Sequence, residues 1–139
     1  MNLSDYLNDN PAVALCAVDV TDDSVLSTLP SLQISIGDTV DIDTADIPES
    51  QVSVIYSRHV SATPEPLISI NISFRIICTM NEEGVKLSKN DVLELLKADK
   101  TIISMCAAKA SLLLSQLTTL MAGNTPIVTP PTFVANNDD

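Results

Sequence analysis

The stretch TIISMCAAKASLLLSQLTTLMA, residues 101–122, decides the fold because it combines helical spacing with an unusually apolar circumference. Its apolar residues fall on two adjacent stripes. The first stripe consists of Ile102, Cys106, Ala110, Leu113, Leu117 and Leu120, and the second of Ile103, Ala107, Leu114 and Met121. The polar positions are Ser104, Ser111, Ser115 and Thr118, a narrow strip that we expect to face water. A helix this apolar must be buried on more than one side.

One sheet covers only one side of such a helix, so the other side needs a second cover. We expect a second copy of the chain to supply it. The predicted oligomer interface consists of Ile103, Ala107, Leu114 and Leu117. The alternative is that a short preceding helix covers this side within one chain. The sequence therefore favours a homo-oligomer, either a dimer or a tetramer.

The residues that flank the long helix carry start and stop signals. Ser88 and Asp91 match a capping box, in which each side chain accepts a hydrogen bond from the backbone N–H of the other. Apolar residues at helical spacing follow, and a bend is expected near Asp99. Gly123 and Pro126 are typical of the end of a helix. The sequence thus predicts a short helix followed by the long one.

The clearest strand lies upstream, at residues 67–80. Its apolar face holds Ile68, Ile70, Ile72, Phe74, Ile76 and Cys78, and its polar face holds Ser69, Asn71, Ser73 and Arg75. This alternation is typical of a strand with one packed face and one wet face. Weaker strand patterns cover residues 12–20, 32–36 and 52–60. In the last of these, one strand face holds Val52, Val54, Tyr56, Arg58 and Val60. Four strands joined by turns predict an α+β fold, a four-stranded antiparallel sheet followed by one long helix.

The whole chain, residues 1–139, is expected to form a single domain. Residues 1–11 and 135–139 are polar and are predicted to be disordered. The proline-rich tail, residues 124–134, is extended by its prolines and is expected to lie back over the sheet.

The charge of the chain is concentrated in its first half. The net charge is -11, and residues 1–57 contain acidic residues but no Lys or Arg. Such a surface repels phosphates and anionic lipids, so nucleic acid and bare membrane are excluded as partners. Lys109 and several hydroxyl side chains also make residues 101–122 a poor membrane span. A basic protein surface suits this charge, although acidic loops also simply aid solubility.

No residue pattern in the chain predicts a catalytic or metal site. Cys16, Cys78 and Cys106 lie far apart among apolar residues and are expected to be buried, reduced thiols of a cytoplasmic protein. His59, the single histidine, has no nearby nucleophile. Gly37 followed by Asp38 is predicted to be a turn or a bulge. The carboxylates of Asp19, Asp22, Asp23, Asp38, Asp41 and Asp43 fall in stretches that read as solvated loops. We expect no metal, no cofactor and no enzyme activity.

The second half of the chain resembles SecB, the bacterial export chaperone. The resemblance covers about residues 67–134 and rests on the order of a strand at 68–80, the helix at 101–122, Gly123 and the run TPIVTPPTF at 125–133. It implies a tetramer built as a dimer of dimers, with the long helices at its centre. It also implies binding of unfolded polypeptide, without ATP, in grooves between the sheet and the crossover loop that follows the long helix. The family has a second helix after this loop, whereas this chain ends six residues after Phe133.

On this basis, we expect an ATP-independent chaperone that binds unfolded or extended polypeptide, with a possible place in protein export. The expected peptide contacts are Met121, Ile127, Val128 and Phe133. The resemblance also implies a basic protein partner such as a translocation motor. The alternative is an oligomeric scaffold, or a dedicated partner of one protein such as a toxin–antitoxin-associated helper, without general chaperone activity.

Overall fold

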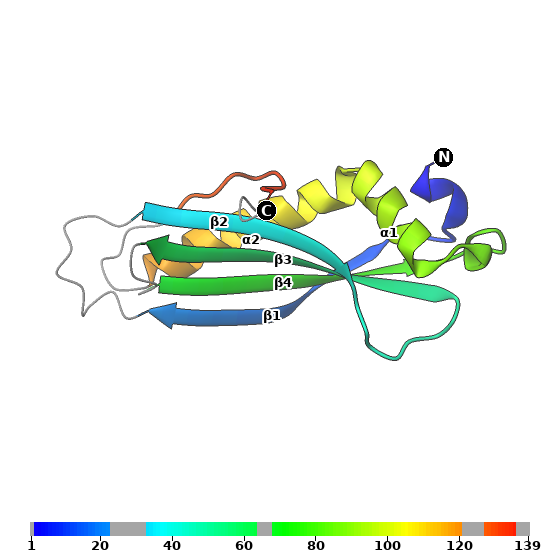
Figure 1. Cartoon of the computed structure of the whole chain (residues 1–139), viewed down its shortest axis with the longest axis horizontal. Helices are drawn as coiled ribbons and strands as arrows, with labels where there is room; N and C mark the ends of the chain where they lie inside the picture. The colour runs from blue at the N-terminus through cyan, green and yellow to red at the C-terminus, as the bar shows by residue number, and fades with distance from the viewer. Residues whose placement is uncertain (1, 23–32, 64–67, 121–126, 136–139) are drawn as a thin grey trace.

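The computed structural model describes residues 2–22, 33–63, 68–120 and 127–135, whose strands form one antiparallel sheet. The strands are β1 (Ala12–Asp22), β2 (Gln33–Ile42), β3 (Gln51–Thr63) and β4 (Ile68–Thr79). Their order in the sheet is β1-β4-β3-β2, so β1 and β2 form its edges (Figure 1). The predicted four-stranded antiparallel sheet is confirmed. β1, β2 and β3 extend beyond the patterns that predicted them, whereas β4 is one residue shorter than its pattern at each end.

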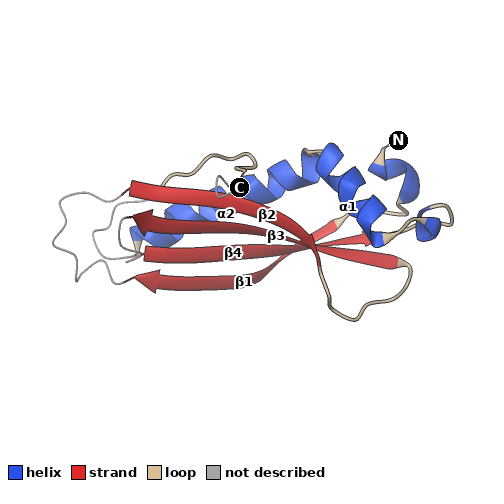
Figure 2. Cartoon of the chain, in the orientation of Figure 1, coloured by secondary structure: helices blue, strands red, loops and turns tan. Residues whose placement is uncertain are grey.

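The helices lie on one face of this sheet (Figure 2). They are the short 3-10 helices η1 (Leu3–Tyr6) and η3 (Gly84–Lys86), followed by α1 (Lys89–Ala98) and α2 (Thr101–Thr119). The capping box of α1 forms as predicted, because the N–H of Asp91 donates to Ser88 Oγ at 3.1 Å and the N–H of Ser88 donates to Asp91 Oδ2 at 3.3 Å. Lys100 adopts a left-handed conformation with a φ of 50° and makes the expected bend between α1 and α2.

The sheet face under the helices, called here the covered face, supplies most of the core. Its buried residues include Val52, Val54, Tyr56 and Val60 of β3 and Ile70, Ile72, Phe74, Ile76 and Cys78 of β4. Alternate residues share a face because side chains of a strand point to opposite sides in turn. Full burial of one such aliphatic side chain stabilises the fold by about 1.5–3 kcal/mol. The two-residue pattern in the sequence therefore identified the packed face of both central strands.

The helix α2 packs on the covered face, with Ile103, Cys106, Ala107, Ala110, Leu114 and Thr118 buried. The length and apolar composition of α2 would also suit a membrane-spanning helix. The core helix of a soluble protein has the same two properties, so they do not distinguish the two kinds of helix. The predicted wet strip is wrong, since Thr118 is buried and Ser111 is half-buried. Both residues instead contact the chain beyond the helix, so the helix is rotated relative to the prediction and exposes Met105 and Leu112.

Two further expectations need correction. Residues 2–11, predicted to be disordered, are placed against the rest of the chain because Leu3 is buried and Leu7 pairs with Met80. Of the thiols, Cys78 and Cys106 are buried as expected, but Cys16 is exposed. Cys16 occupies an irregular position in the edge strand β1, where the register to β4 shifts between Leu15 and Ala17. An edge strand buries fewer of its side chains than a central strand does.

Candidate polypeptide-binding site

The C-terminal segment, defined here as residues 127–135, lies back along β2 and beside α2 (Figure 1). Two hydrogen bonds attach it to the polar strip of α2. The hydroxyl of Ser111 donates to the carbonyl oxygen of Thr129 at 2.6 Å, and the N–H of Ile127 donates to Thr118 Oγ1 at 2.6 Å. The tail was expected to lie over the sheet, and these contacts explain why the polar strip of the helix is not wet.

The sheet holds the C-terminal segment through a buried ion pair. Arg58 of β3 and Asp38 of β2 face each other in register, and their side chains are fully buried. Two parallel hydrogen bonds join them, from Nε to Oδ1 at 2.8 Å and from Nη2 to Oδ2 at 2.7 Å. This two-pronged geometry is the strong form of an arginine–carboxylate pair. Asp38 is therefore neither in a turn nor solvated, contrary to the sequence prediction.

The remaining hydrogen-bonding capacity of the ion pair goes to the C-terminal segment. Arg58 Nη1 donates to Thr129 Oγ1 at 2.9 Å and to the carbonyl oxygen of Pro130 at 2.6 Å, and Nη2 donates to the carbonyl oxygen of Thr132 at 2.8 Å. The N–H of Val134 donates to Asp38 Oδ2 at 2.9 Å, and the N–H of Asp38 donates to the carbonyl oxygen of Val134 at 2.9 Å. We call these contacts the Arg58–Asp38 clamp.

The charge state of the clamp is fixed by its surroundings. Burial alone would lower the pKa of Arg58, but the hydrogen bonds and the charge of Asp38 outweigh it and leave that pKa above its ordinary value. Tyr56 is buried on the same strand face, and burial together with the charge of Asp38 raises the pKa of its hydroxyl far above the ordinary value. Arg58 is thus cationic and Tyr56 protonated at any physiological pH.

The clamp leaves apolar side chains of the C-terminal segment exposed. Val128 is 79% exposed and Phe133 is 44% exposed, whereas Ile127 is half-buried. On the neighbouring helix, Leu112 is 62% exposed. The structure thus places three of the four predicted peptide contacts on one ordered segment, while Met121 lies outside the described residues.

The predicted interface residues of α2 lie elsewhere. Ile103, Ala107 and Leu114 are buried against the sheet of the same chain, and Leu117 is half-buried. The sheet of the same chain therefore covers most of the stripe that was predicted to contact a second copy. The apolar side chains that α2 leaves on its surface are Met105 and Leu112, with Leu120 at its C-terminal end.

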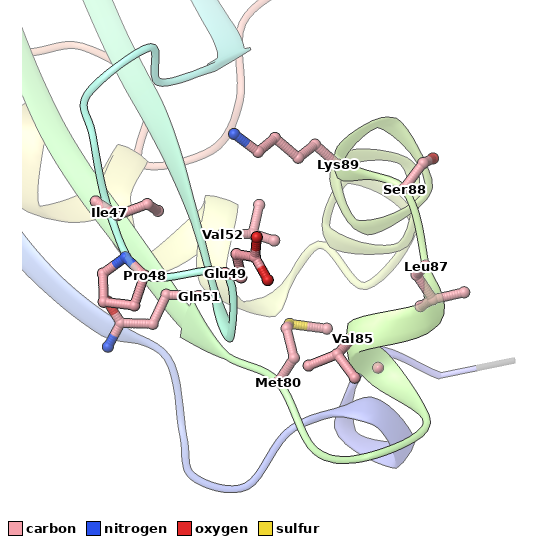
Figure 3. Close-up of a pocket in the computed structure, with 11 residues that line it drawn as sticks. Ile47, Pro48, Glu49, Gln51, Val52, Met80, Val85, Leu87, Ser88 and Lys89 are labelled. Atoms are coloured by element: carbon pink, nitrogen blue, oxygen red, sulfur yellow. The ribbon is translucent and has the colours of Figure 1, made fainter.

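A separate pocket of about 320 Å³ opens between the loop that joins β2 to β3 and the start of α1 (Figure 3). Its lining consists of Ile47, Pro48, Glu49, Gln51, Val52, Met80, Gly84, Val85, Leu87, Ser88 and Lys89. At Gly84 a Cβ atom would collide with the carbonyl oxygen of Tyr6, so the chain can pass there only as glycine. None of the described peptide contacts predicted from sequence lines this pocket.

The opposite face of the sheet, called here the open face, carries small polar side chains. A shallow hollow of about 440 Å³ is lined by Ser35, Gly37, Thr39, Ser57, His59, Ser61 and Asn71. His59 is exposed there. Arg75 pairs with Asp43 at 2.8 Å on this face, and Asp43 also accepts from Ser53 Oγ. Among the described residues, no group of three or more His, Cys, Asp or Glu side chains is placed to hold a metal ion.

The clamp residues were missed in the sequence, although a signal was present. Arg58 was assigned to the same strand face as Tyr56 and Val60, which makes it a charge on an apolar face. Asp38 continues the alternation of Ile34 and Ile36 but was interpreted as a turn because it follows Gly37. A charge on the apolar side of each of two adjacent strands is the pattern of a buried ion pair.

Comparison with known proteins supports the fold. No family model matches the chain, and no curated protein matches its sequence. A solved structure of Rv1957, a SecB-like chaperone of Mycobacterium tuberculosis in complex with a ChAD peptide from the Rv1956 HigA1 antitoxin, is similar with a TM-score of 0.60, at 15% identity, over 92% of this chain and 88% of that one. A protein of unknown function from Streptococcus agalactiae has a TM-score of 0.38 at 10% identity, over 87% of this chain and 97% of that one. The chain thus has a SecB-like fold, as the resemblance of its second half to SecB predicted.

Proposed function

We propose that this protein binds extended, apolar polypeptide segments without ATP, as a chaperone does. The observation that carries the proposal is the exposure of Val128 and Phe133 on a segment that polar contacts hold in place. Side chains that are already ordered lose little conformational entropy on binding. Each apolar side chain that becomes fully buried contributes about 1.5–3 kcal/mol. A few such anchors suit weak, sequence-tolerant binding.

The SecB-like neighbour supports the choice of ligand. Its structure holds a peptide from an antitoxin, so a chain of this fold can carry a polypeptide segment. The neighbour is a chaperone, which favours binding over catalysis for this chain as well. A dedicated partner protein, rather than many clients, is the second candidate, because the peptide in that structure comes from one antitoxin.

We also propose that the protein assembles as a homo-oligomer. The edge strand β1 exposes Leu15, Val18 and Val20, and no other described strand pairs with its outer edge. An unpaired edge with apolar side chains is a template for pairing with another chain. Burial of this edge against a second copy would explain its apolar composition. The size of the oligomer follows from the light-scattering mass of the purified protein.

A cytoplasmic location and a basic partner, such as a translocation motor, complete the proposal. Cys16, Cys78 and Cys106 are all free thiols, which suits a reducing compartment. Asp41, Asp46 and Glu49 are exposed around the loop that follows β2 and offer negative charge to a basic surface. Salt-dependent binding of a basic partner protein would support this part of the proposal.

Light scattering tests the binding function. The protein is added in excess to chemically unfolded citrate synthase as the enzyme aggregates, and we expect aggregation to slow. The double variant Val128→Ser/Phe133→Ser should bind the unfolded enzyme at least about tenfold more weakly, since two apolar anchors are lost. The control variant Val85→Ser removes a side chain that is 50% exposed at the separate pocket and should stay within about twofold of the wild type.

Unchanged aggregation in the presence of excess wild-type protein would contradict the binding function. If Val85→Ser alone weakened binding, the binding site would be the pocket of Figure 3 and not the C-terminal segment. Affinity capture from the host separates the two candidates. Many unfolded proteins indicate a general chaperone, and one stoichiometric folded partner indicates a dedicated one.

A further inference from the structure

We propose that the Arg58–Asp38 clamp is a receptor for the main chain of an extended polypeptide, and that the C-terminal segment occupies it as a replaceable ligand. This inference rests on the proposed function and adds a second step to it. Val128 and Phe133 contact the apolar side chains of a client, and the backbone of the client then takes over the contacts that the C-terminal segment makes with the clamp.

The bonded atoms of the C-terminal segment belong mostly to its main chain. The carbonyl oxygens of Pro130, Thr132 and Val134 bind Arg58 Nη1, Arg58 Nη2 and the N–H of Asp38 in turn. The segment bends at Pro131 and Thr132, between these contacts. Every polypeptide carries carbonyl oxygens of this kind, so the clamp contacts the backbone of its ligand much more than its side chains.

The position of the clamp at a sheet edge supports the same conclusion. β2 is an edge strand, and the backbone of Asp38 pairs outward with Val134 through its N–H. The side chain of Asp38 accepts from the N–H of Val134, which completes a two-bond contact with one residue of the ligand strand. Addition of an extended segment to an exposed edge is an established mode of peptide recognition, in which main-chain hydrogen bonds supply the affinity.

The composition of the C-terminal segment makes it replaceable. Val128, Pro130, Pro131 and Phe133 are all exposed, so the segment buries little apolar surface of its own. Its attachment depends on polar contacts, and Thr129 Oγ1 is the side-chain atom of the segment that Arg58 contacts. A client with better apolar side chains provides the same carbonyls and adds hydrophobic burial. Exchange then favours the client.

The buried charges make exchange more favourable than simple release. Release of the segment alone would replace the carbonyl oxygens of Pro130 and Thr132 at Arg58 by water, and the contacts of the segment would be lost without compensation. A client that supplies its own carbonyl oxygens restores these charge-assisted hydrogen bonds, so exchange is more favourable than release. Binding of a client and departure of the segment are one coupled event.

Hydrogen exchange of backbone amides tests the coupling in the full-length protein. The probe is reduced, carboxymethylated α-lactalbumin, which stays unfolded. On saturation with the probe, we expect the amides of Ile127 and Val134 to exchange about tenfold faster or more, because their acceptors Thr118 and Asp38 are left behind. The amide of Asp38 should stay protected, because a carbonyl of the probe replaces that of Val134.

If the probe binds and the amides of Ile127 and Val134 keep their protection, the C-terminal segment is a fixed part of the protein, and this inference is wrong while the proposed function stands. If the probe does not bind at all, both are wrong. These two failures are distinguished by the same titration.

A pair of matched double variants adds an independent readout. Asp38→Leu/Arg58→Met replaces the clamp by apolar residues of similar size, a change that buried ion pairs often tolerate. It should remove the protection of the Val134 amide without any probe and weaken probe binding about tenfold or more. The control Asp43→Leu/Arg75→Met removes the ion pair of the open face and should leave both quantities unchanged. Equal probe affinity in the two variants would overturn the inference.

Discussion

The covered face and the open face of the sheet each carry one arginine–aspartate pair, and the surroundings of the two pairs differ. Arg58 and Asp38 are fully buried, and their spare donors and acceptors bind the C-terminal segment. On the open face, Arg75 is 42% exposed, and its partner Asp43 bonds only to nearby residues of the loop and of β3. The same chemical pair thus organises a distant segment where water is excluded and tethers a loop where water is present.

The largest difference in stability between the two faces is expected when the arginine of each pair is replaced by alanine. Arg58→Ala leaves Asp38 buried without a counter-charge and should lower the free energy of unfolding by about 3–5 kcal/mol. Arg75→Ala breaks a pair that water already screens and should cost less than about 1 kcal/mol. Urea denaturation of both variants measures the two values. Similar losses for both would show that burial does not distinguish the pairs.

The two sides of α2 differ in burial in the same way as the two ion pairs do. Leu114 is fully buried against the covered face, whereas Leu112 is 62% exposed. Leu114→Ala should destabilise the fold by about 2–5 kcal/mol, because it removes apolar contacts and leaves a cavity. Leu112→Ala should change stability by no more than about 0.5 kcal/mol. A substantial loss for Leu112→Ala that grows with protein concentration would reveal a second copy seated on this side of the helix.

The outcome for α2 shows how far the sequence could predict the fold. Apolar alternation identified the packed faces of β3 and β4, and Ser88 with Asp91 identified the start of α1, since both signals are local. The exposed side of α2 could not be found in this way, because Ser111 and Thr118 are polar yet face the C-terminal segment. Their partners come later in the chain, so only the tertiary structure shows that the strip is covered.

The candidate site was predicted in part for the same reason. The exposed residues Val128 and Phe133 were identified from a family resemblance, whereas the clamp beneath them was not. Asp38, Arg58 and residues 129–134 are far apart in the sequence, and only the pairing of β2 with β3 brings them together. Long-range polar contacts leave no periodic signal, although a charge on a buried strand face indicates that some partner must exist.

The reactivity of the three thiols compares two buried positions with one position in an edge strand. Burial raises the pKa of Cys78 and of Cys106 to about 11 each, so both remain protonated at pH 8. In the folded protein at pH 8, we expect one thiol, that of Cys16, to react with Ellman's reagent, and all three to react in urea. Because burial raises these pKa values from 9.0, the folded state holds the two thiol protons more tightly than the unfolded state does. The stability that depends on these protons is complete below pH 9.0 and is lost as the pH rises toward 11. Rapid reaction of three thiols without denaturant would contradict the burial.

The smallest effect is expected at the ion pair of the open face and depends on pH. The N–H of Ala45 lowers the pKa of Asp43 most, and the hydroxyl of Ser53 and the charge of Arg75 lower it further. A carboxylate whose pKa is lower in the folded state stabilises the fold above its unfolded value of 3.8 and loses this effect as the pH falls through the folded value. Asp43→Asn should therefore cost less than about 1 kcal/mol at pH 7, because Arg75 is partly exposed.

Urea titrations of Asp43→Asn and of the wild type at pH 7 and at a series of pH values below 3.8 measure this difference. The difference at pH 7 should shrink as the pH falls through the lowered pKa of Asp43, because the wild-type carboxylate then becomes protonated in the folded state as well. Arg58→Ala should instead remain destabilised in the same range, since it also removes the donors that bind the carbonyl oxygens of Pro130 and Thr132, whose loss does not depend on a proton. A pH-independent gap for Asp43→Asn would mean that Asp43 acts through the shape of its loop and not through its charge.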